Sequence, residues 1–271
     1  MTIALKLKML KQILIISMLL FTSSALAIDN EAPIKTEHKK SKYPWSIGLS
    51  GIFTLNPYKD TKRSRLLFPF IGYRGERFTF SGPYISYKII KTHGFSLAIS
   101  GFLHSDKFRP RDTSNLQMKQ LNTRRYSFMT GIEAKYNLKR IGSLSARVAR
   151  SIIGADGYTA TGTIGTAVPI IFERSMIMIR PGLGLQWQSR KLINYYYGIS
   201  SAESKRSGFN AYAPESAVIP FVSLSTMYIY KKRYSAMLTI KTRRLSDQMY
   251  NSPMVDKRFL TSIIVVLAYA F

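Results

Sequence analysis

YSFMTGIEAKYNL, residues 126–138, alternates two kinds of side chain. Phe128, Ile132 and Tyr136 share one parity, whereas Ser127 and Glu133 share the other. Successive side chains of a β-strand point to opposite faces, so this segment has one apolar and one polar face. The stretch therefore predicts a long amphipathic strand.

The same period of two recurs in residues 94–103, 175–188 and 233–243. A soluble β-sandwich would give this alternation too. Two features favour a transmembrane barrel. The strands run to about 10–13 residues, against about 5–6 in soluble proteins. The polar faces also place charges among small residues, as with Arg147 between Ser145 and Ala149, which suits a wet lumen better than a dry core. The 17 tyrosines and 15 phenylalanines are consistent with the aromatic girdles of such barrels.

The last stretch, FLTSIIVVLAYAF at 259–271, places an apolar row on one face and stops at an aromatic residue. An aromatic final residue on a lipid-facing row resembles the signal by which the outer-membrane assembly machinery recognises barrels. We therefore expect Tyr269 and Phe271 to form that assembly signal.

The N-terminus has the order of a secretory signal peptide. Lys6, Lys8 and Lys11 precede the apolar run 13–21, and small residues follow up to Ala27. The run is shorter than the ~20 residues that span a bilayer as a helix. We expect a cleaved signal peptide at 1–27, a flexible basic periplasmic leader at 28–43 and an outer-membrane β-barrel at 44–271.

A parity argument gives the number of strands. Both ends of the barrel should face the periplasm, with short turns there and long loops outside, so the count is even. The alternation of long and short connections holds only if 77–90 is split near Ser81-Gly82-Pro83. The expectation is an all-β, antiparallel, up-and-down barrel of about 12 strands, with 10 as the alternative. The expected strands are 45–54, 64–73, 77–81, 84–90, 94–103, 126–137, 142–153, 158–172, 174–188, 216–230, 233–245 and 258–271.

The chain is strongly basic, with a formal net charge of +26, and has no cysteine. A basic balance points to nucleic acid or to anionic surfaces. Export argues against nucleic acid and favours outer-membrane lipid and lipopolysaccharide phosphates. The lack of cysteine excludes disulfides and thiolate chemistry.

Several motifs resemble the MipA/OmpV family, the MltA-interacting protein group. They are WSIGLSG at 45–51, LFPFIGYRGERF at 67–78 and YYYGISSAES at 195–204. The resemblance covers essentially all of 44–271. It singles out six candidate residues of one loop: Tyr197, Gly198, Glu203, Ser204, Arg206 and Tyr212. This loop either binds a partner or folds over the mouth of the barrel, or it is simply held by its own hydrogen bonds.

The resemblance implies a non-enzymatic scaffold that joins a murein lytic transglycosylase to a murein synthase. Other family members are described as antigens, adhesins or permeability factors. This chain departs from the family in its basic loops, above all 104–125, so partner specificity does not carry over.

The residues themselves favour no enzyme. His104 and Asp106 are the residues that most resemble a catalytic pair, but the ordinary interpretation is that they are two unrelated loop residues. We expect no catalytic, cofactor or metal site. A basic lumen favours anions, so a small anion-preferring channel is the alternative to the scaffold, unless the charges pair with Glu133 and fill the lumen. An adhesin acting through basic loops is a further alternative. The predicted basic lumen residues are Lys135, Arg147, Arg180, Lys241 and Arg243.

Overall fold

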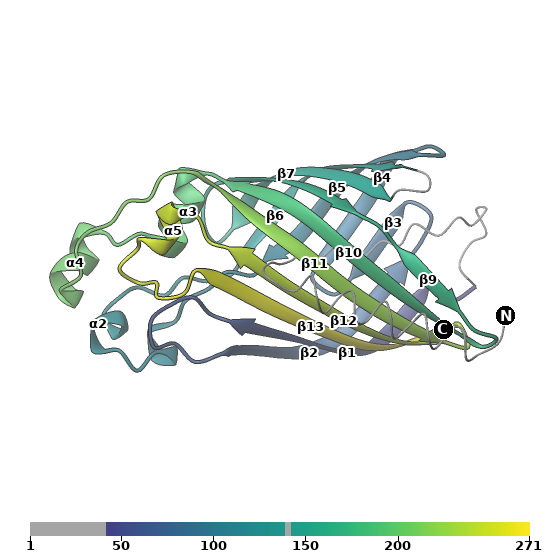
Figure 1. Ribbon diagram of the computed structural model, residues 1–271, viewed down its shortest axis with the longest axis horizontal. Helices are drawn as coiled ribbons and strands as arrows, with labels where there is room; N and C mark the ends of the chain where they lie inside the picture. Colours follow the sequence, from purple (N-terminus) through teal and green to yellow (C-terminus); the bar gives the residue numbers. More distant parts are fainter. Residues whose placement is uncertain (1–41, 139–141) are drawn as a thin grey trace, which may run out of the picture.

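The computed structural model describes residues 42–138 and 142–271, which form an antiparallel β-barrel with loops and short helices gathered at one end (Figure 1). The predicted signal peptide at 1–27 and most of the predicted leader lie outside the described residues. The strands are β1 (Trp45–Leu55), β2 (Ser64–Arg74), β3 (Phe78–Ser81), β4 (Tyr84–Lys91), β5 (Phe95–His104), β6 (Ser127–Asn137), β7 (Ser143–Ile153), β8 (Tyr158–Gly165), β9 (Val168–Ile171), β10 (Ser175–Gln188), β11 (Ala217–Tyr230), β12 (Tyr234–Arg244) and β13 (Phe259–Ala270).

The barrel has twelve strand positions, as the parity argument predicts. The split of 77–90 is confirmed, because β3 and β4 are separate strands joined by a turn at Gly82, whose φ of 55° favours glycine. The expected single strand at 158–172 is wrong in detail. It is interrupted between β8 and β9, which both pair with β10 in one register. Pro181 lies opposite this break and has no N–H to donate, so the ladder lapses there.

The barrel closes where β13 pairs with β1, with Ser46 opposite Ala270, and where β10 pairs with β11. The Phe271 N–H donates to the Trp45 carbonyl at 3.0 Å, so the last residue takes part in this closure. The two strands approach so closely that a Cβ on Gly48 would lie 1.8 Å from the Leu267 carbonyl oxygen. The aromatic-ended C-terminal strand is thus the one that seals the barrel.

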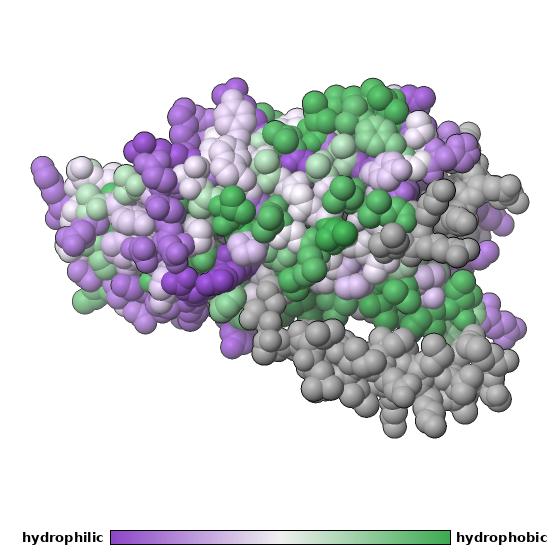
Figure 2. All heavy atoms as spheres, turned by 45° about the horizontal axis from the view of Figure 1, so that its top comes forward, coloured by the Kyte–Doolittle hydropathy of each residue, from purple (hydrophilic) through white to green (hydrophobic). Residues whose placement is uncertain are grey.

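Side chains divide between the two faces of the wall as the alternation predicts. Leu49, Leu67 and Leu267 point outwards and are exposed, whereas Ser50, Ser100 and Ser262 are buried on the inner face. Figure 2 shows hydrophobic residues gathered over the strands and hydrophilic residues over the looped end. The apolar exterior is what a lipid-embedded barrel requires.

The long connections 56–63, 105–126, 189–216 and 245–258 lie together at the end opposite the start of β1 and the C-terminal residue, and we call them the loop cap (Figure 1). Its apolar residues, with a few inward residues from the ends of the strands, form the main hydrophobic core of the described residues. None of the helices described has the length and apolar character to cross a membrane. The helices are η1 (Pro110–Asp112), α2 (Leu116–Lys119), α3 (Arg190–Tyr197), α4 (Ser201–Ser207) and α5 (Asp247–Tyr250).

Candidate functional site

The local sequence of α4 dictates its start. Ser200 is the N-cap residue, and its hydroxyl accepts a hydrogen bond from the Glu203 N–H at 3.3 Å. The Glu203 carboxylate in turn accepts the Ser200 N–H at 3.1 Å. This reciprocal capping box satisfies two backbone donors that a helix start would otherwise leave free. It also fixes the direction in which the Glu203 carboxylate points.

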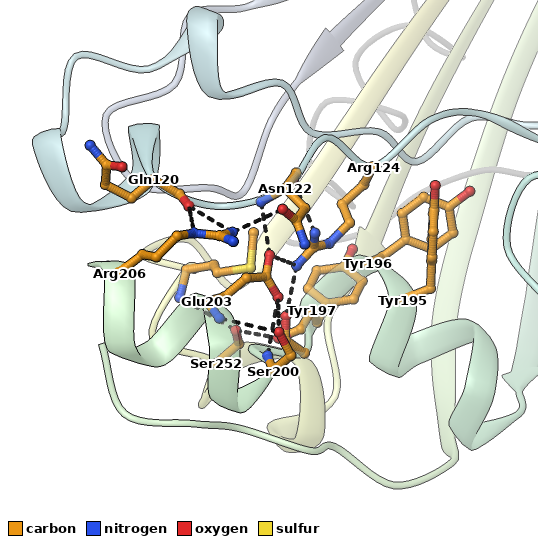
Figure 3. A network of polar contacts seen from close by, with 12 residues as sticks. Gln120, Asn122, Arg124, Tyr195, Tyr196, Tyr197, Ser200, Glu203, Arg206 and Ser252 are labelled. Carbon is orange, nitrogen blue, oxygen red and sulfur yellow. Dashed lines mark hydrogen bonds and ion pairs between the residues drawn. The ribbon is translucent and has the colours of Figure 1, made fainter. Parts of the chain in front are cut away.

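Glu203 ties α4 to the 105–126 loop, as Figure 3 shows. Its Oε1 accepts the Asn122 N–H and an Arg124 Nη2 hydrogen, each at 2.8 Å. Both charged side chains are almost fully buried. Burial raises the pKa of the Glu203 carboxyl, but the hydrogen bonds from Asn122, Ser200 and Arg124 outweigh it and hold that pKa below its usual value. Glu203 is therefore ionised and joins two loops through hydrogen bonds; we call Glu203 with its partners Asn122, Arg124 and Ser200 the clasp.

Arg124 and Arg206 extend this clasp to the rest of the cap (Figure 3). The Arg124 guanidinium also donates to the Gly198 carbonyl at 3.1 Å. The exposed Arg206 donates to the Gln120 carbonyl at 3.2 Å and to Asn122 Oδ1 at 2.9 Å. Two segments far apart in sequence, 120–124 and 198–206, are thereby joined at several points.

The tyrosine run at the end of α3 packs beneath the clasp. The Tyr196 and Ser127 hydroxyls lie 2.7 Å apart, and the Tyr58 hydroxyl donates to the Tyr196 carbonyl at 3.3 Å. Tyr58, Tyr196 and Tyr197 are fully buried. Burial raises the pKa of all three phenols, so they stay neutral. Their rings are therefore structural groups of the cap core.

A second buried ion pair joins the cap to the barrel wall. The Arg243 guanidinium of β12 binds the Asp106 carboxylate through both terminal nitrogens. His104 Nε2 lies 3.4 Å from Asp106 Oδ2. Burial opposes ionisation of Asp106, but Arg243 and His104 outweigh it and hold the pKa of this carboxyl well below its usual range. His104 and Asp106 are neighbours, as considered from the sequence, and the group that binds Asp106 most closely is Arg243.

The predicted basic residues all lie on inward-facing strand positions, and their surroundings differ. Arg147 is paired with Glu133, with its Nε 2.7 Å from Glu133 Oε2, while the Lys241 ammonium lies 4.5 Å from the centre of the Phe221 ring. Arg180 is half-buried, and Lys135 lies on the inner face of β6. Two of the five, Arg147 and Arg243, have their charge neutralised by a carboxylate, which weakens the support for an anion path. The channel stays a prediction.

The six loop residues singled out from the sequence do come together in the cap. Tyr197, Gly198 and Glu203 are buried, Ser204 and Tyr212 are half-buried, and Arg206 is exposed. The Tyr212 hydroxyl donates to the Gln248 carbonyl at 2.9 Å, which links the 189–216 and 245–258 loops. Binding of a partner by this cluster stays a prediction. Sequence reasoning missed Arg124 and Ser200, although Ser200 with Glu203 has the spacing of a capping box.

The family model described as "MltA-interacting protein MipA" matches residues 47–271. The chain belongs to this family. The MltA-interacting protein of Escherichia coli (strain K12) is 28% identical over 86% of this chain and 92% of its own length. The putative outer membrane protein YiaT of the same organism is 25% identical over 83% of this chain and 90% of its own length.

Membership of the MltA-interacting protein family, with the barrel fold, places the protein in the outer membrane as a barrel of the scaffold or interacting class. A solved structure of a bacterial polysaccharide outer membrane secretin aligns with 84% of this chain and 99% of its own, at 8% identity and a TM-score of 0.37. A likeness that distant carries no argument about function. Within the described residues, no group of three or more His, Asp or Glu side chains is placed to hold a metal ion.

Proposed function

We propose that this barrel is a scaffold that binds a murein lytic transglycosylase at its periplasmic face and links it to a murein synthase. The observation that carries the proposal is family membership over residues 47–271, with a relative of 28% identity named for interaction with MltA. A murein enzyme works in the periplasm. The docking surface should therefore lie at the end of the barrel that carries the start of β1 and the end of β13, opposite the loop cap.

The turns at that end form a basic surface. Among the described residues of these turns and their flanks, the exposed ionisable side chains comprise two acids, Glu76 and Glu173, and a larger set of bases. A surface of one sign raises the association rate of a partner of opposite sign. This supports a partner with an acidic face. The exposed lysines and arginines are Arg74, Arg77, Lys91, Arg174, Lys231, Lys232 and Arg233, and His93 lies among them.

One of these turns holds its lysines in an unfavourable conformation. Lys231 and Lys232 have φ values of 49° and 59°, and the Arg233 N–H donates to the Tyr230 carbonyl at 3.1 Å. A hairpin turn with two positive φ values is normally Asn-Gly. Two lysines there cost about 1 kcal/mol each in backbone strain. Strain of this kind is often found where a side chain has a function, which supports a role for this turn in docking.

The experiment is capture of the purified transglycosylase and the purified synthase on the immobilised barrel. The test variant replaces Lys231 and Lys232 by Asn and Gly, which keeps the turn, removes two charges and relieves the strain. The matched control replaces Lys119 and Lys205, two exposed lysines of the cap, by Asn. We expect the turn variant to fold at least as well as the wild type and to retain less transglycosylase. Failure of the wild-type barrel to retain any transglycosylase would remove the proposal.

A further inference from the structure

The barrel wall is incomplete on one side. β2 pairs with β3 only from Gly72 to Arg74, and the β3–β4 hairpin turns back at Gly82. At the same level Tyr84 of β4 lies opposite Phe102 of β5. Above this turn, no strand of the described residues pairs with positions 64–71 of β2 on that side. The wall therefore has an opening between β2 and the end of β5, which we call the side window.

The edge of β2 that faces the side window has a residue suited to a strand without a neighbour. The Ile71 carbonyl accepts the Gly82 N–H at 3.0 Å, so the Ile71 backbone faces the window side. Backbone groups alternate sides along a strand, which places the Pro69 and Leu67 backbones on the same side. Proline lacks an N–H and is confined to strand edges within sheets. Pro69 therefore removes one unpaired donor where the wall has no partner strand.

The side window lies at the level of the bilayer hydrocarbon. Leu67 and Ile71 flank it on the outer face of β2, and their exposed fractions are 74% and 49%. The window is closed towards the cap, where the Lys62 N–H donates to the Asp112 carbonyl at 2.9 Å and Thr61 bridges Thr113. It is thus a bounded opening in the apolar belt of the barrel and not an open seam.

A cavity of about 140 Å³ lies behind the window. The lining includes apolar residues from each side of the window: Phe68 and Phe70 of β2, Pro83 and Tyr84 of the hairpin, and Phe102 and Leu103 of β5. Leu103 belongs to the outward-facing parity of β5 and still lines the cavity, so the cavity reaches the window. The rest of the lining is mixed and includes Ser50, Gln186 and Ser262. A wholly apolar cavity of similar size holds one benzene molecule, so the volume here admits one such ring.

The route into this cavity from the barrel mouth is obstructed. The packed core of the cap lies across that end, with Tyr58, Tyr196 and Tyr197 fully buried in it. Of the basic residues in the lining, Arg147 and Arg243 are held by carboxylates. The Lys241 ammonium lies 4.5 Å from the centre of the Phe221 ring, and His104 Nε2 lies 3.4 Å from Asp106 Oδ2. The cap therefore shields the cavity from water at the outer end of the barrel, whereas the side window faces the bilayer.

We propose that the side window is a lateral portal and that the cavity behind it binds one hydrocarbon group from the bilayer. The group is either a free single-ring aromatic molecule or the end of a lipid acyl chain. Both have the same chemistry and differ in source. The binding is independent of any murein enzyme.

The test uses a tryptophan in the cavity as a contact reporter. The two native tryptophans, at positions 45 and 187, are replaced by Phe, and Phe102→Trp places an indole in the lining. The barrel is reconstituted in phosphatidylcholine vesicles with plain acyl chains or with chains brominated near their ends, because bromine quenches tryptophan on contact. Toluene is then titrated into both preparations.

Cavity-filling variants supply the control. Ser262→Leu and Ser50→Leu place extra carbon in the cavity from two different strands, whereas Ser223→Leu makes the same change on the inner face of β11, outside the lining. Gel electrophoresis at low temperature, with and without heating of the sample beforehand, establishes that each variant is folded, because a folded barrel migrates faster when it has not been heated. Two filling variants keep the test sound if one of them does not fold.

If an acyl chain enters the cavity, the tryptophan emission should be lower in brominated vesicles than in plain ones. Toluene and either filling variant should reduce this quenching, whereas Ser223→Leu should leave it unchanged. Entry of a free hydrocarbon only predicts no bromine quenching, with a saturable change of emission on toluene addition that the filling variants abolish. Emission that is insensitive to both probes, or equally sensitive when the cavity is filled, would overturn the proposal.

Discussion

Removal of Glu203 should open the loop cap while the barrel stays intact. Its carboxylate accepts hydrogen bonds from Asn122, Arg124 and Ser200, and the ion pair with Arg124 is almost fully buried. Loss of one partner of a buried pair costs about 3–5 kcal/mol, because the other charge is left without compensation. For Glu203→Ala this free energy acts on cap opening, and at 1.4 kcal/mol per factor of ten it raises the open population by about 100-fold to a few thousand-fold.

Limited trypsin digestion measures this population. Lys205 and Arg206 are exposed cleavage sites on α4, but a protease needs the helix to unfold locally. When opening is fast relative to cleavage, the cleavage rate follows the open population. We expect Glu203→Ala to be cut at 205–206 faster than the wild type by the same large factor, with the barrel strands protected.

Glu215→Gln is the matched control. Glu215 lies in the same connection, and its pair with Arg190 is more than half exposed, so its loss costs about 0–1 kcal/mol. Equal cleavage rates for Glu203→Ala, Glu215→Gln and the wild type would refute the view that Glu203 holds the cap closed.

Three further predictions follow from the same contacts. Asp106→Asn should destabilise the barrel by about 3–5 kcal/mol in urea unfolding from vesicles, whereas Asp106→Leu with Arg243→Leu should recover much of that loss; equal stability of all three proteins would contradict a buried pair. Gly48→Val should prevent barrel closure, seen as absence of the fast-migrating folded form on unheated gels, because its Cβ would collide with the Leu267 carbonyl; a normally folded variant would disprove the close approach of β1 and β13. The Glu203 carboxyl has a pKa lowered by folding, so its stabilisation is complete above the unfolded pKa near 4.5 and is lost as pH falls through the lower folded value. Hydrogen exchange of the cap should therefore stay constant from about pH 8 to pH 5, after correction for the intrinsic rate, and accelerate only at lower pH, less steeply in Glu203→Gln.

The strands could be predicted from the sequence because each lipid-exposed strand alternates apolar side chains on its outer face with polar side chains on its inner face. The alternation in 126–138 corresponds to β6, and the parity of long and short connections requires the separation of β3 from β4. The one strand whose extent was wrong, 158–172, is interrupted by a residue that lies elsewhere in the chain. Pro181 breaks the ladder only through its position opposite β8 and β9, which a local pattern does not contain.

The candidate site, too, was partly predictable from the sequence and partly not. By itself, the sequence predicted an exported barrel of about twelve strands, with ten as the alternative, and with inward basic residues, because period, strand length and connection length are local properties. Only the tertiary structure decided that Glu203 binds Arg124, that Asp106 takes Arg243, and that β2 lacks a partner over 64–71. These contacts join residues 79 to 137 positions apart, or depend on a missing neighbour. Their energies come from burial and geometry across loops, which no single stretch of sequence specifies.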